Sequence, residues 1–304
     1  MPGAPIPRAI PDFGVGPPVV TEEPVVVAPG VVRVTALNPS IMTGPGTNTY
    51  LVGSTDLVAI DPGPVIEGHL EGMQRWVADS ESRIRWIAVT HHHRDHAPAA
   101  KALAEQTGAE VIAFGHPDGV DPDRQVGDGF VLNGPDFRLR ALHTPGHASD
   151  HLCWLLEEEL LLFSGDHVMQ GSTVVIPPPD GNMTVYLASL GRLLELDPPI
   201  ATVAPGHGRL IGDPSGVIKA IVTHRLEREA KVLAELEDMG RGSVDDLLPL
   251  VYPEVADALV AVARATLWAH LQKLAVDGRA RLLDDDQSDP LLSSATSSWG
   301  PAVG

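Results

Sequence analysis

The chain has 304 residues, of which 40 are Asp or Glu and 21 are Lys or Arg, so its formal net charge is −19. Such an acidic excess repels polyanions and excludes a broad basic surface of the kind that drives nonspecific nucleic-acid binding. The single cysteine, Cys153, excludes an intramolecular disulfide framework, and a 43% share of hydrophobic residues is enough to bury a core.

Residues 1–24 are rich in proline and glycine and are expected to form an extended N-terminal arm. They lack both the basic start and the continuous apolar stretch of a signal peptide. No segment of the chain reaches the roughly 18 uninterrupted apolar residues of a membrane span. We therefore expect a cytoplasmic protein without membrane contact.

Alternating strands and helices follow the arm and predict an α/β domain over residues 25–215. Apolar, β-branched runs predict early strands at residues 25–34, 49–52 and 57–60. Apolar residues spaced by three and four predict helices at residues 66–80, 97–107 and 182–196. The second helix starts directly after a His-rich loop, so its N-terminus would favour an anionic ligand there.

That His-rich loop places four possible metal donors within six residues, just after the apolar segment 84–89. Imidazole and carboxylate are ligands that zinc accepts at neutral pH. His91 and His93 are two residues apart and share one face, whereas Asp95 and His96 lie one step along the loop, where they could hold a second ion. The alternative, a solvated His-rich turn, is disfavoured by the donors that follow downstream.

Three further donors appear downstream, each after its own apolar segment. Segments 139–142, 160–163 and 200–204 each lead to Gly or Pro beside a donor, and these donors are His147, Asp166 and His207. Strands that break at Gly or Pro present side chains from loops on a rigid scaffold. Four independent junctions therefore agree on one site. His151 and His167 each follow a donor closely and could serve as proton donors.

Charged helices after residue 215 predict a second, winged-helix-like domain over residues 216–284. Its predicted parts are helices at 216–239, after Ser243 and at 254–276, followed by a turn into a strand at 279–283. The third helix offers only Arg264, His270 and Lys273 to DNA, so we expect a packing module beside the active site rather than a DNA reader. The acidic and Ser-rich residues 285–304 are expected to be disordered.

The ordered motifs HxHxDH, TPGH, SGD and PGHG resemble those of the metallo-β-lactamase superfamily over residues 30–215. The resemblance implies a four-layer αββα sandwich with two metal ions at one sheet edge. It further implies a division of the donors, in which one zinc is bound by His91, His93 and His147, the other by Asp95, His96 and His207, and both by a bridging Asp166.

Segment 38–50, together with the C-terminal winged helix, is similar to the lactamase-β-like branch of the superfamily. This branch includes the mitochondrial endoribonuclease and many bacterial hydrolases of unsettled substrate. Asp61 sits where relatives place a carboxylate that orients ligand histidines, and the same Asp-Pro-Gly residues also fit an ordinary turn.

Two zinc ions would lower the pKa of a bridging water from about 15.7 to about 7, and Asp95 and Asp166 would align the resulting hydroxide. Mn2+ or Fe2+ would be tolerated by the same ligands. A thioester or other small acyl substrate ranks first, because the chain is acidic and has only 4% aromatic residues to stack bases. Cleavage of single-stranded RNA is the alternative; hydrolysis of a β-lactam or lactone and noncatalytic metal binding rank lower.

Overall fold

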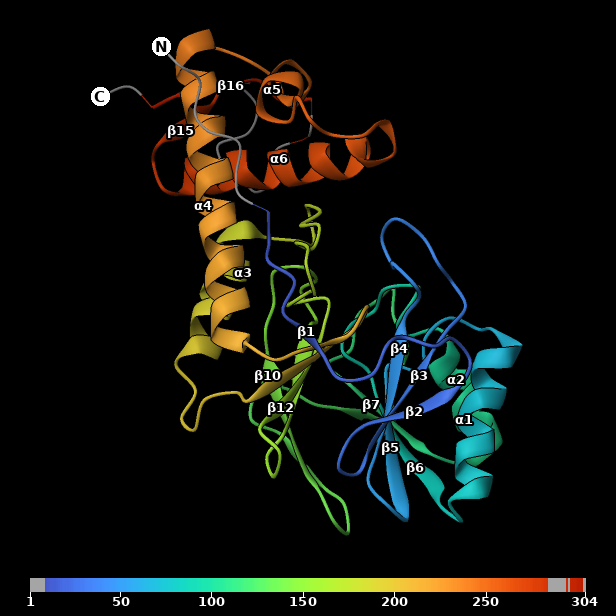
Figure 1. Ribbon diagram of the computed structural model, residues 1–304. Coiled ribbons are helices and arrows are strands. Elements are labelled where there is room, and N and C mark those ends of the chain that lie inside the picture. Colours follow the sequence, from blue (N-terminus) through green and yellow to red (C-terminus); the bar gives the residue numbers. More distant parts are fainter. Residues whose placement is uncertain (1–8, 284–293, 295, 303–304) are drawn as a thin grey trace.

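Two facing seven-stranded sheets form the main body of the computed structural model, which describes residues 9–283, 294 and 296–302. Helices cover the outer face of each sheet (Figure 1). The predicted four-layer αββα sandwich with a C-terminal winged helix is confirmed. None of the described helices is long and apolar enough to cross a membrane.

The first sheet contains the strands from the N-terminal half of the chain. In spatial order they are β2 (Pro24–Ala28), β3 (Val31–Thr35), β4 (Asn48–Val52), β5 (Asp56–Ile60), β6 (Arg83–Ala88), β7 (Glu110–Ala113) and β8 (Arg124–Gln125). The prediction of one strand over residues 25–34 is wrong, because β2 and β3 form an antiparallel pair. Gly30 takes φ +62° in the turn between them, a conformation that glycine adopts without a steric penalty.

The second sheet combines later strands with part of the N-terminal arm. In spatial order they are β1 (Gly14–Val15), β14 (Leu210–Ile211), β13 (Thr202–Pro205), β12 (Leu161–Gly165), β11 (Leu152–Leu156), β10 (Arg138–His143) and β9 (Val131–Asn133). Within the described arm, β1 pairs antiparallel with β14 and Ile10 is buried. Strand pairing and burial therefore fix this part of the arm against the second sheet.

Three apolar cores separate the layers. One lies between the sheets, one between the first sheet and the helices α1 (Glu67–Asp79) and α2 (Ala99–Thr107), and one between the second sheet and α3 (Met183–Leu194). Strand β11 shows how one strand contributes to two cores. Cys153 and Leu155 pack toward α3, whereas Trp154 between them packs toward the first sheet. Successive side chains of a strand alternate in direction, so a strand buried on both faces is apolar throughout.

A long helix, α4 (Pro214–Met239), connects the sandwich to the C-terminal domain (Figure 1). At 1.5 Å per residue its 26 residues span about 39 Å. Its first turns pack on the second sheet, and its last turns join the core of the C-terminal domain. The remaining elements of that domain are α5 (Val244–Val251), the 3-10 turn η1 (Asp257–Leu259), α6 (Val260–Val276), β15 (Ala280–Leu282) and β16 (Trp299–Pro301).

Two predictions for the C-terminal domain need correction. The third helix was expected from Glu254, but the α-helix begins at Val260, because Ala256 is extended with φ −70° and ψ 148°. Part of the tail expected to be disordered, Trp299–Pro301, forms β16 and pairs with β15. Trp299 is fully buried in the domain core, which explains why this segment is ordered. Most of residues 285–304 lies outside the described part of the chain.

Candidate metal centre

The seven predicted metal ligands meet where strand ends of both sheets face each other. The His-rich loop follows β6 of the first sheet, while the other three ligands follow β10, β12 and β13 of the second. They form two groups with donor atoms within 4.8 Å of one another: His91, His93 and His147 in one, and Asp95, His96, Asp166 and His207 in the other. The structure therefore brings all the predicted ligands together.

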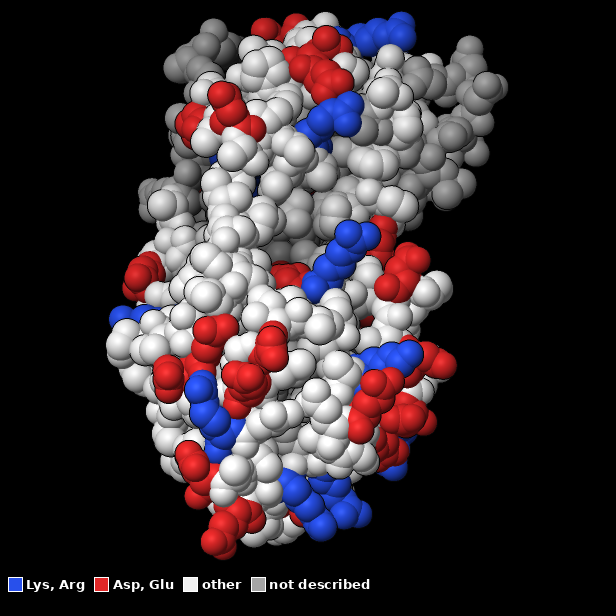
Figure 2. Space-filling model, turned by 90° about the vertical axis from the view of Figure 1, so that its right-hand side faces the viewer, with Lys and Arg blue, Asp and Glu red and all other residues white. Residues whose placement is uncertain are grey.

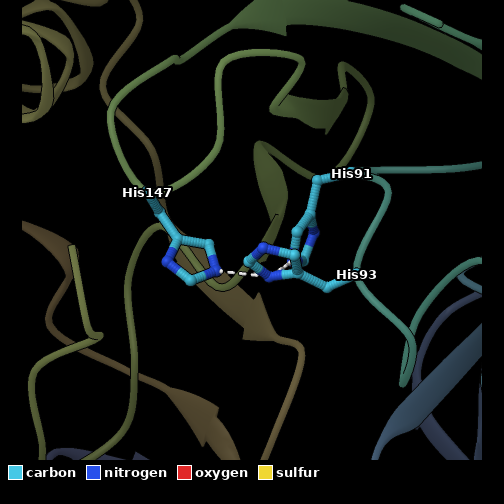
Figure 3. Close-up of side chains that lie close together, drawn as sticks. All are labelled: His91, His93 and His147. Atoms are coloured by element: carbon cyan, nitrogen blue, oxygen red, sulfur yellow. Dashed lines mark hydrogen bonds between the residues drawn. The ribbon is translucent and has the colours of Figure 1, made fainter. Parts of the chain in front are cut away.

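The first group consists of three imidazole rings that point toward one another (Figure 3). His93 Nδ1 lies 3.0 Å from both His91 Nε2 and His147 Nε2. On the outer side, His147 Nδ1 donates to the carbonyl of Val175 at 2.6 Å. A neutral imidazole has one protonated nitrogen, so the inward Nε2 of His147 carries a lone pair.

The same reasoning fixes the tautomer of His91. The hydroxyl of Thr90 donates to Asp61 at 2.7 Å, so its oxygen must accept from His91 Nδ1 at 2.9 Å. The Nε2 of His91 therefore also carries an inward lone pair. One N–H of His93 can satisfy only one of these two neighbours, whereas a metal ion would bind all three nitrogens.

In the second group, imidazole nitrogens face carboxylate oxygens. His96 Nδ1 donates to Asp61 at 2.8 Å, and His207 Nδ1 donates to the carbonyl of Gly46 at 3.1 Å. Their inward Nε2 atoms each lie 3.3 Å from Asp166 Oδ1. Both His96 Nε2 and Asp166 Oδ1 are buried without a hydrogen-bond partner. An Nε2 lone pair would repel a carboxylate oxygen, so this arrangement requires either a proton on the ring nitrogen or a metal cation between the two atoms.

The pKa values of the first group are all lowered, with burial as the largest cause. The pKa of His91 falls well below its usual value, that of His93 falls to about 3, and that of His147 is also lowered. These three rings are therefore neutral at neutral pH. Neutral imidazoles are the protonation state that binds a metal ion.

In the second group the neighbouring carboxylates raise the pKa values of the histidines, opposite to the lowering in the first group. Burial opposes the charge of His207, but Asp166 raises its pKa to about 9. Burial likewise opposes the charge of His96, but Asp95 and Asp166 raise its pKa well above the usual value. Despite burial, the charges of these histidines lower the pKa of Asp95 to about 2. The two carboxylates thus hold positive charge at this point, which protons or a divalent cation can supply.

Asp61 holds Thr90 and His96 in position through hydrogen bonds. It is 2% exposed, its Oδ1 accepts from the Thr90 amide at 2.7 Å, and its Oδ2 accepts from both the Thr90 hydroxyl and His96. Its φ of +51° shows that the Asp-Pro-Gly segment is also a sharp turn. The predicted contact between Asp61 and one of the predicted ligand histidines, His96, is therefore confirmed.

Asp61→Asn is expected to weaken metal binding by about 10- to 100-fold, because the amide has only one acceptor oxygen for three donors. The measurement is competition with a chromogenic chelator. Asp56→Asn is the matched control, since Asp56 forms an exposed ion pair with Arg83 and should leave metal affinity unchanged. Equal affinities of the two variants would contradict this role of Asp61.

A third histidine-carboxylate group lies nearby, formed by His92, His116 and Asp180. The two imidazole rings are stacked, with centroids 3.9 Å apart and planes at 9°. Lone pairs lie in the plane of a ring, so those of parallel stacked rings run side by side and do not converge on one ion. This group therefore does not have the geometry of the other two.

The prediction that His151 and His167 could donate protons to the substrate is wrong. Both are fully buried behind the ligands, and neither lines the cavity in front of them. Burial lowers the pKa of His151 well below its usual value and that of His167 to about 3, so both are neutral. His151 instead stacks on His91, with ring centroids 4.9 Å apart, and supports that ring from behind.

A cavity of about 720 Å³ lies in front of the ligands. Its walls come from the ligand loops, the segment before β4 and the C-terminal domain, including Ile41, Met42, Tyr252, Leu259 and Val262. Figure 2 shows the surface hollowed between the C-terminal domain above and the sandwich below. The C-terminal domain contributes to these walls, in agreement with the expected packing module beside the active site. The individual wall residues of that domain were not identified from the sequence, because apolar side chains that line a cavity look the same in a sequence as core residues.

Comparisons with known proteins agree with this architecture. The Metallo-beta-lactamase superfamily matches residues 42–207, and the Beta-lactamase associated winged helix domain matches residues 243–288. A Beta-lactamase-like protein 2 homolog of Drosophila melanogaster is 31% identical, and the match covers 83% of this chain and 90% of that protein. An Atrochrysone carboxyl ACP thioesterase of Aspergillus chevalieri is 35% identical, over 72% of this chain and 71% of that protein.

Two solved structures share the fold. A metallo-beta-lactamase family protein from Thermus thermophilus has a TM-score of 0.72 and 21% identity, covering 90% of this chain and 99% of that one. A beta-lactamase domain protein from Burkholderia ambifaria has a TM-score of 0.76 and 20% identity, covering 92% and 94%. At these identities the likeness establishes the arrangement of both domains and nothing about substrates.

Proposed function

The chain belongs to the metallo-β-lactamase superfamily, and from its site we propose that it is a zinc-dependent hydrolase of a thioester or another small acyl substrate. The observation that carries the proposal is the set of seven converging donors at the base of a cavity with largely apolar walls. Relatives named as thioesterases, such as the Aspergillus chevalieri protein, support an acyl substrate.

In this proposal two zinc ions would be held, one by each group of ligands. Asp166 faces both groups: its Oδ1 lies 3.3 Å from His96 Nε2 and His207 Nε2, while its Oδ2 lies 3.7 Å from His147 Nε2. Such ions, when bound, activate water and polarise a carbonyl group. Zinc is favoured by the nitrogen and oxygen donors, and Mn2+ or Fe2+ would fit the same ligands.

Asp95 and Asp166 are the residues that we propose to orient the attacking water. Both line the cavity, and the pKa of each is lowered, so each is an ionised hydrogen-bond acceptor at neutral pH. A water molecule that donates a hydrogen bond to one of these carboxylates would be held inside the cavity.

The lack of a strong proton donor for the leaving group also favours a thioester substrate. Among the described histidines that are not proposed ligands, His224 lines the cavity, and burial lowers its pKa to about 4. A neutral ring of this kind is a poor acid for an alkoxide leaving group. A thiol with a pKa of about 8.5 leaves as a stable thiolate and needs little help from an acid.

RNA cleavage is less well supported by the surface. On the face shown in Figure 2, basic side chains are separated by acidic ones and form no continuous strip over its described residues. Tyr252 is the one Phe, Tyr or Trp side chain among the described residues that line the cavity, so few bases could stack there. Single-stranded RNA is therefore included in the test below as the alternative substrate.

The test compares zinc-loaded protein on a panel of acyl thioesters, a labelled single-stranded RNA and a β-lactam. We expect thiol release from thioesters and a fall of about 10³-fold or more in His93→Ala, which loses a donor of the first group. His143→Ala is the matched control, because His143 contacts the Ser149 carbonyl and belongs to neither ligand group. RNA cleavage without thioester turnover would overturn the proposal, and equal activity of the two variants would indicate contamination.

A further inference from the structure

Arg225, on α4, is a buried cation in the wall of the cavity. It is 3% exposed and lines the same cavity as the proposed ligands. Its Nη2 donates to the carbonyl of Val174, its guanidinium carbon lies 5.8 Å from the ring centroid of Tyr186, and its Nε has no hydrogen-bond partner. Among the described residues no carboxylate forms an ion pair with Arg225, although an isolated buried charge is costly.

The surroundings of Arg225 do not neutralise its charge. Arg228, one turn along α4, also lines the cavity, but its Nη2 contacts Glu254 at 2.9 Å, so its charge is balanced. His270 lies fully buried behind this wall with both ring nitrogens unpartnered. Burial is the main cause that lowers the pKa of His270, and Arg225 and Arg228 lower it further. The α4 wall therefore carries an unbalanced positive charge within a chain of net charge −19.

Arg225 is linked to the metal centre through two consecutive residues. The carbonyl of Val174 accepts from Arg225, and the carbonyl of Val175 accepts from the proposed ligand His147. Consecutive Cα atoms are about 3.8 Å apart, so the guanidinium and the ligand are anchored to neighbouring points of one backbone segment. The side chains of Val174 and Val175 supply apolar wall to the same cavity.

We propose that Arg225 binds a carboxylate on the acyl group of the substrate, so that the enzyme prefers half-thioesters of short dicarboxylic acids. This inference rests on the proposed thioester hydrolysis. One unbalanced guanidinium matches one carboxylate, which it can bind through two N–H groups. A phosphate dianion would need further donors, and the neighbouring Arg228 is already engaged with Glu254. The apolar wall suits the methylene groups of the acyl chain.

The test compares a half-thioester, glutaryl-N-acetylcysteamine, with its neutral ω-amide of the same size. In the wild type we expect kcat/KM to favour the carboxylate by about 10-fold or more, mainly through KM, as for a hydrogen bond to a charged group. Arg225→Met should reduce this preference to within about twofold, and Arg225→Lys should restore part of it. Arg264→Met is the control and should retain the preference, because Arg264 pairs with Asp245 outside the cavity.

The wild-type comparison alone can overturn the inference, so misfolding of a variant does not leave it open. Equal turnover of the acid and the amide would refute carboxylate recognition while leaving thioester hydrolysis in place. No turnover of any thioester would refute both proposals. A preference for coenzyme A thioesters of neutral acyl groups that is lost in Arg225→Met would assign the anion to a phosphate on the thiol portion and would also overturn this inference.

Discussion

Asp166→Asn is expected to lower kcat for the best thioester by about 10³-fold or more and to reduce the metal content of the purified protein. The aspartate has one oxygen facing His96 and His207 at 3.3 Å and the other facing His147 at 3.7 Å. An asparagine keeps the shape but replaces one of these oxygens by an NH2 group, which cannot bind a cation. One of the two ligand groups therefore loses the oxygen donor that Asp166 contributes to it.

The measurement pairs elemental analysis with steady-state kinetics. Asp150→Asn is the matched control, because Asp150 is also a buried carboxylate, 5% exposed, but contacts His92 at 2.9 Å and belongs to neither ligand group. We expect it to keep its metal and most of its activity. If Asp166→Asn retained full metal content and activity, the carboxylate would not lie between two ions, and the proposed centre would have to be redrawn.

The site could be predicted from the sequence because its geometry is local at each step. A strand that ends at Gly or Pro fixes the direction of the next few side chains, as where β12 ends at Gly165 and Asp166 follows. The order of the junctions after β10, β12 and β13 along the chain follows the order of these strands in the second sheet, and the junction after β6 faces them from the first sheet. The contact of Asp61 with a predicted ligand histidine was expected from the family resemblance, and the adjacent parallel strands β5 and β6 bring Asp61 and His96 together.

What the sequence did not reveal depends on contacts between distant segments. The sequence predicted a packing module beside the active site, but not that Tyr252 and Leu259 line the cavity, because this depends on how α4 places the C-terminal domain over the predicted ligands. Strand β16 has no apolar periodicity, and it is ordered because Trp299 fills the core beside β15. The sequence also could not show whether His151 faces the cavity or lies behind the predicted ligands. A short distance along the chain from a ligand does not determine the direction in which a side chain points.

Gly206→Ala tests the geometry of the centre without removing any donor. A Cβ at this position would lie 2.7 Å from His96 Cε1 and 2.8 Å from Asp166 Oδ1, closer than real Cβ contacts allow. The backbone cannot retreat easily, because the Gly206 amide donates to Gly165 at 2.8 Å and its carbonyl accepts from Asn48 at 2.8 Å. The methyl group must therefore displace the two ligand side chains.

We expect Gly206→Ala to lose about 10²-fold in kcat, because displacing a reacting group by about 1 Å costs that much. Metal affinity should fall for the second ligand group, with a far-ultraviolet spectrum like that of the wild type. Gly191→Ala is the control: nothing lies within 4 Å of its Cβ, and it sits within α3, where alanine favours the helix. All seven donors remain in Gly206→Ala, so wild-type kinetics there would mean that activity does not depend on how tightly His96 and Asp166 are positioned. A loss of activity with unchanged metal content would instead assign the effect to the orientation of the attacking water by Asp166.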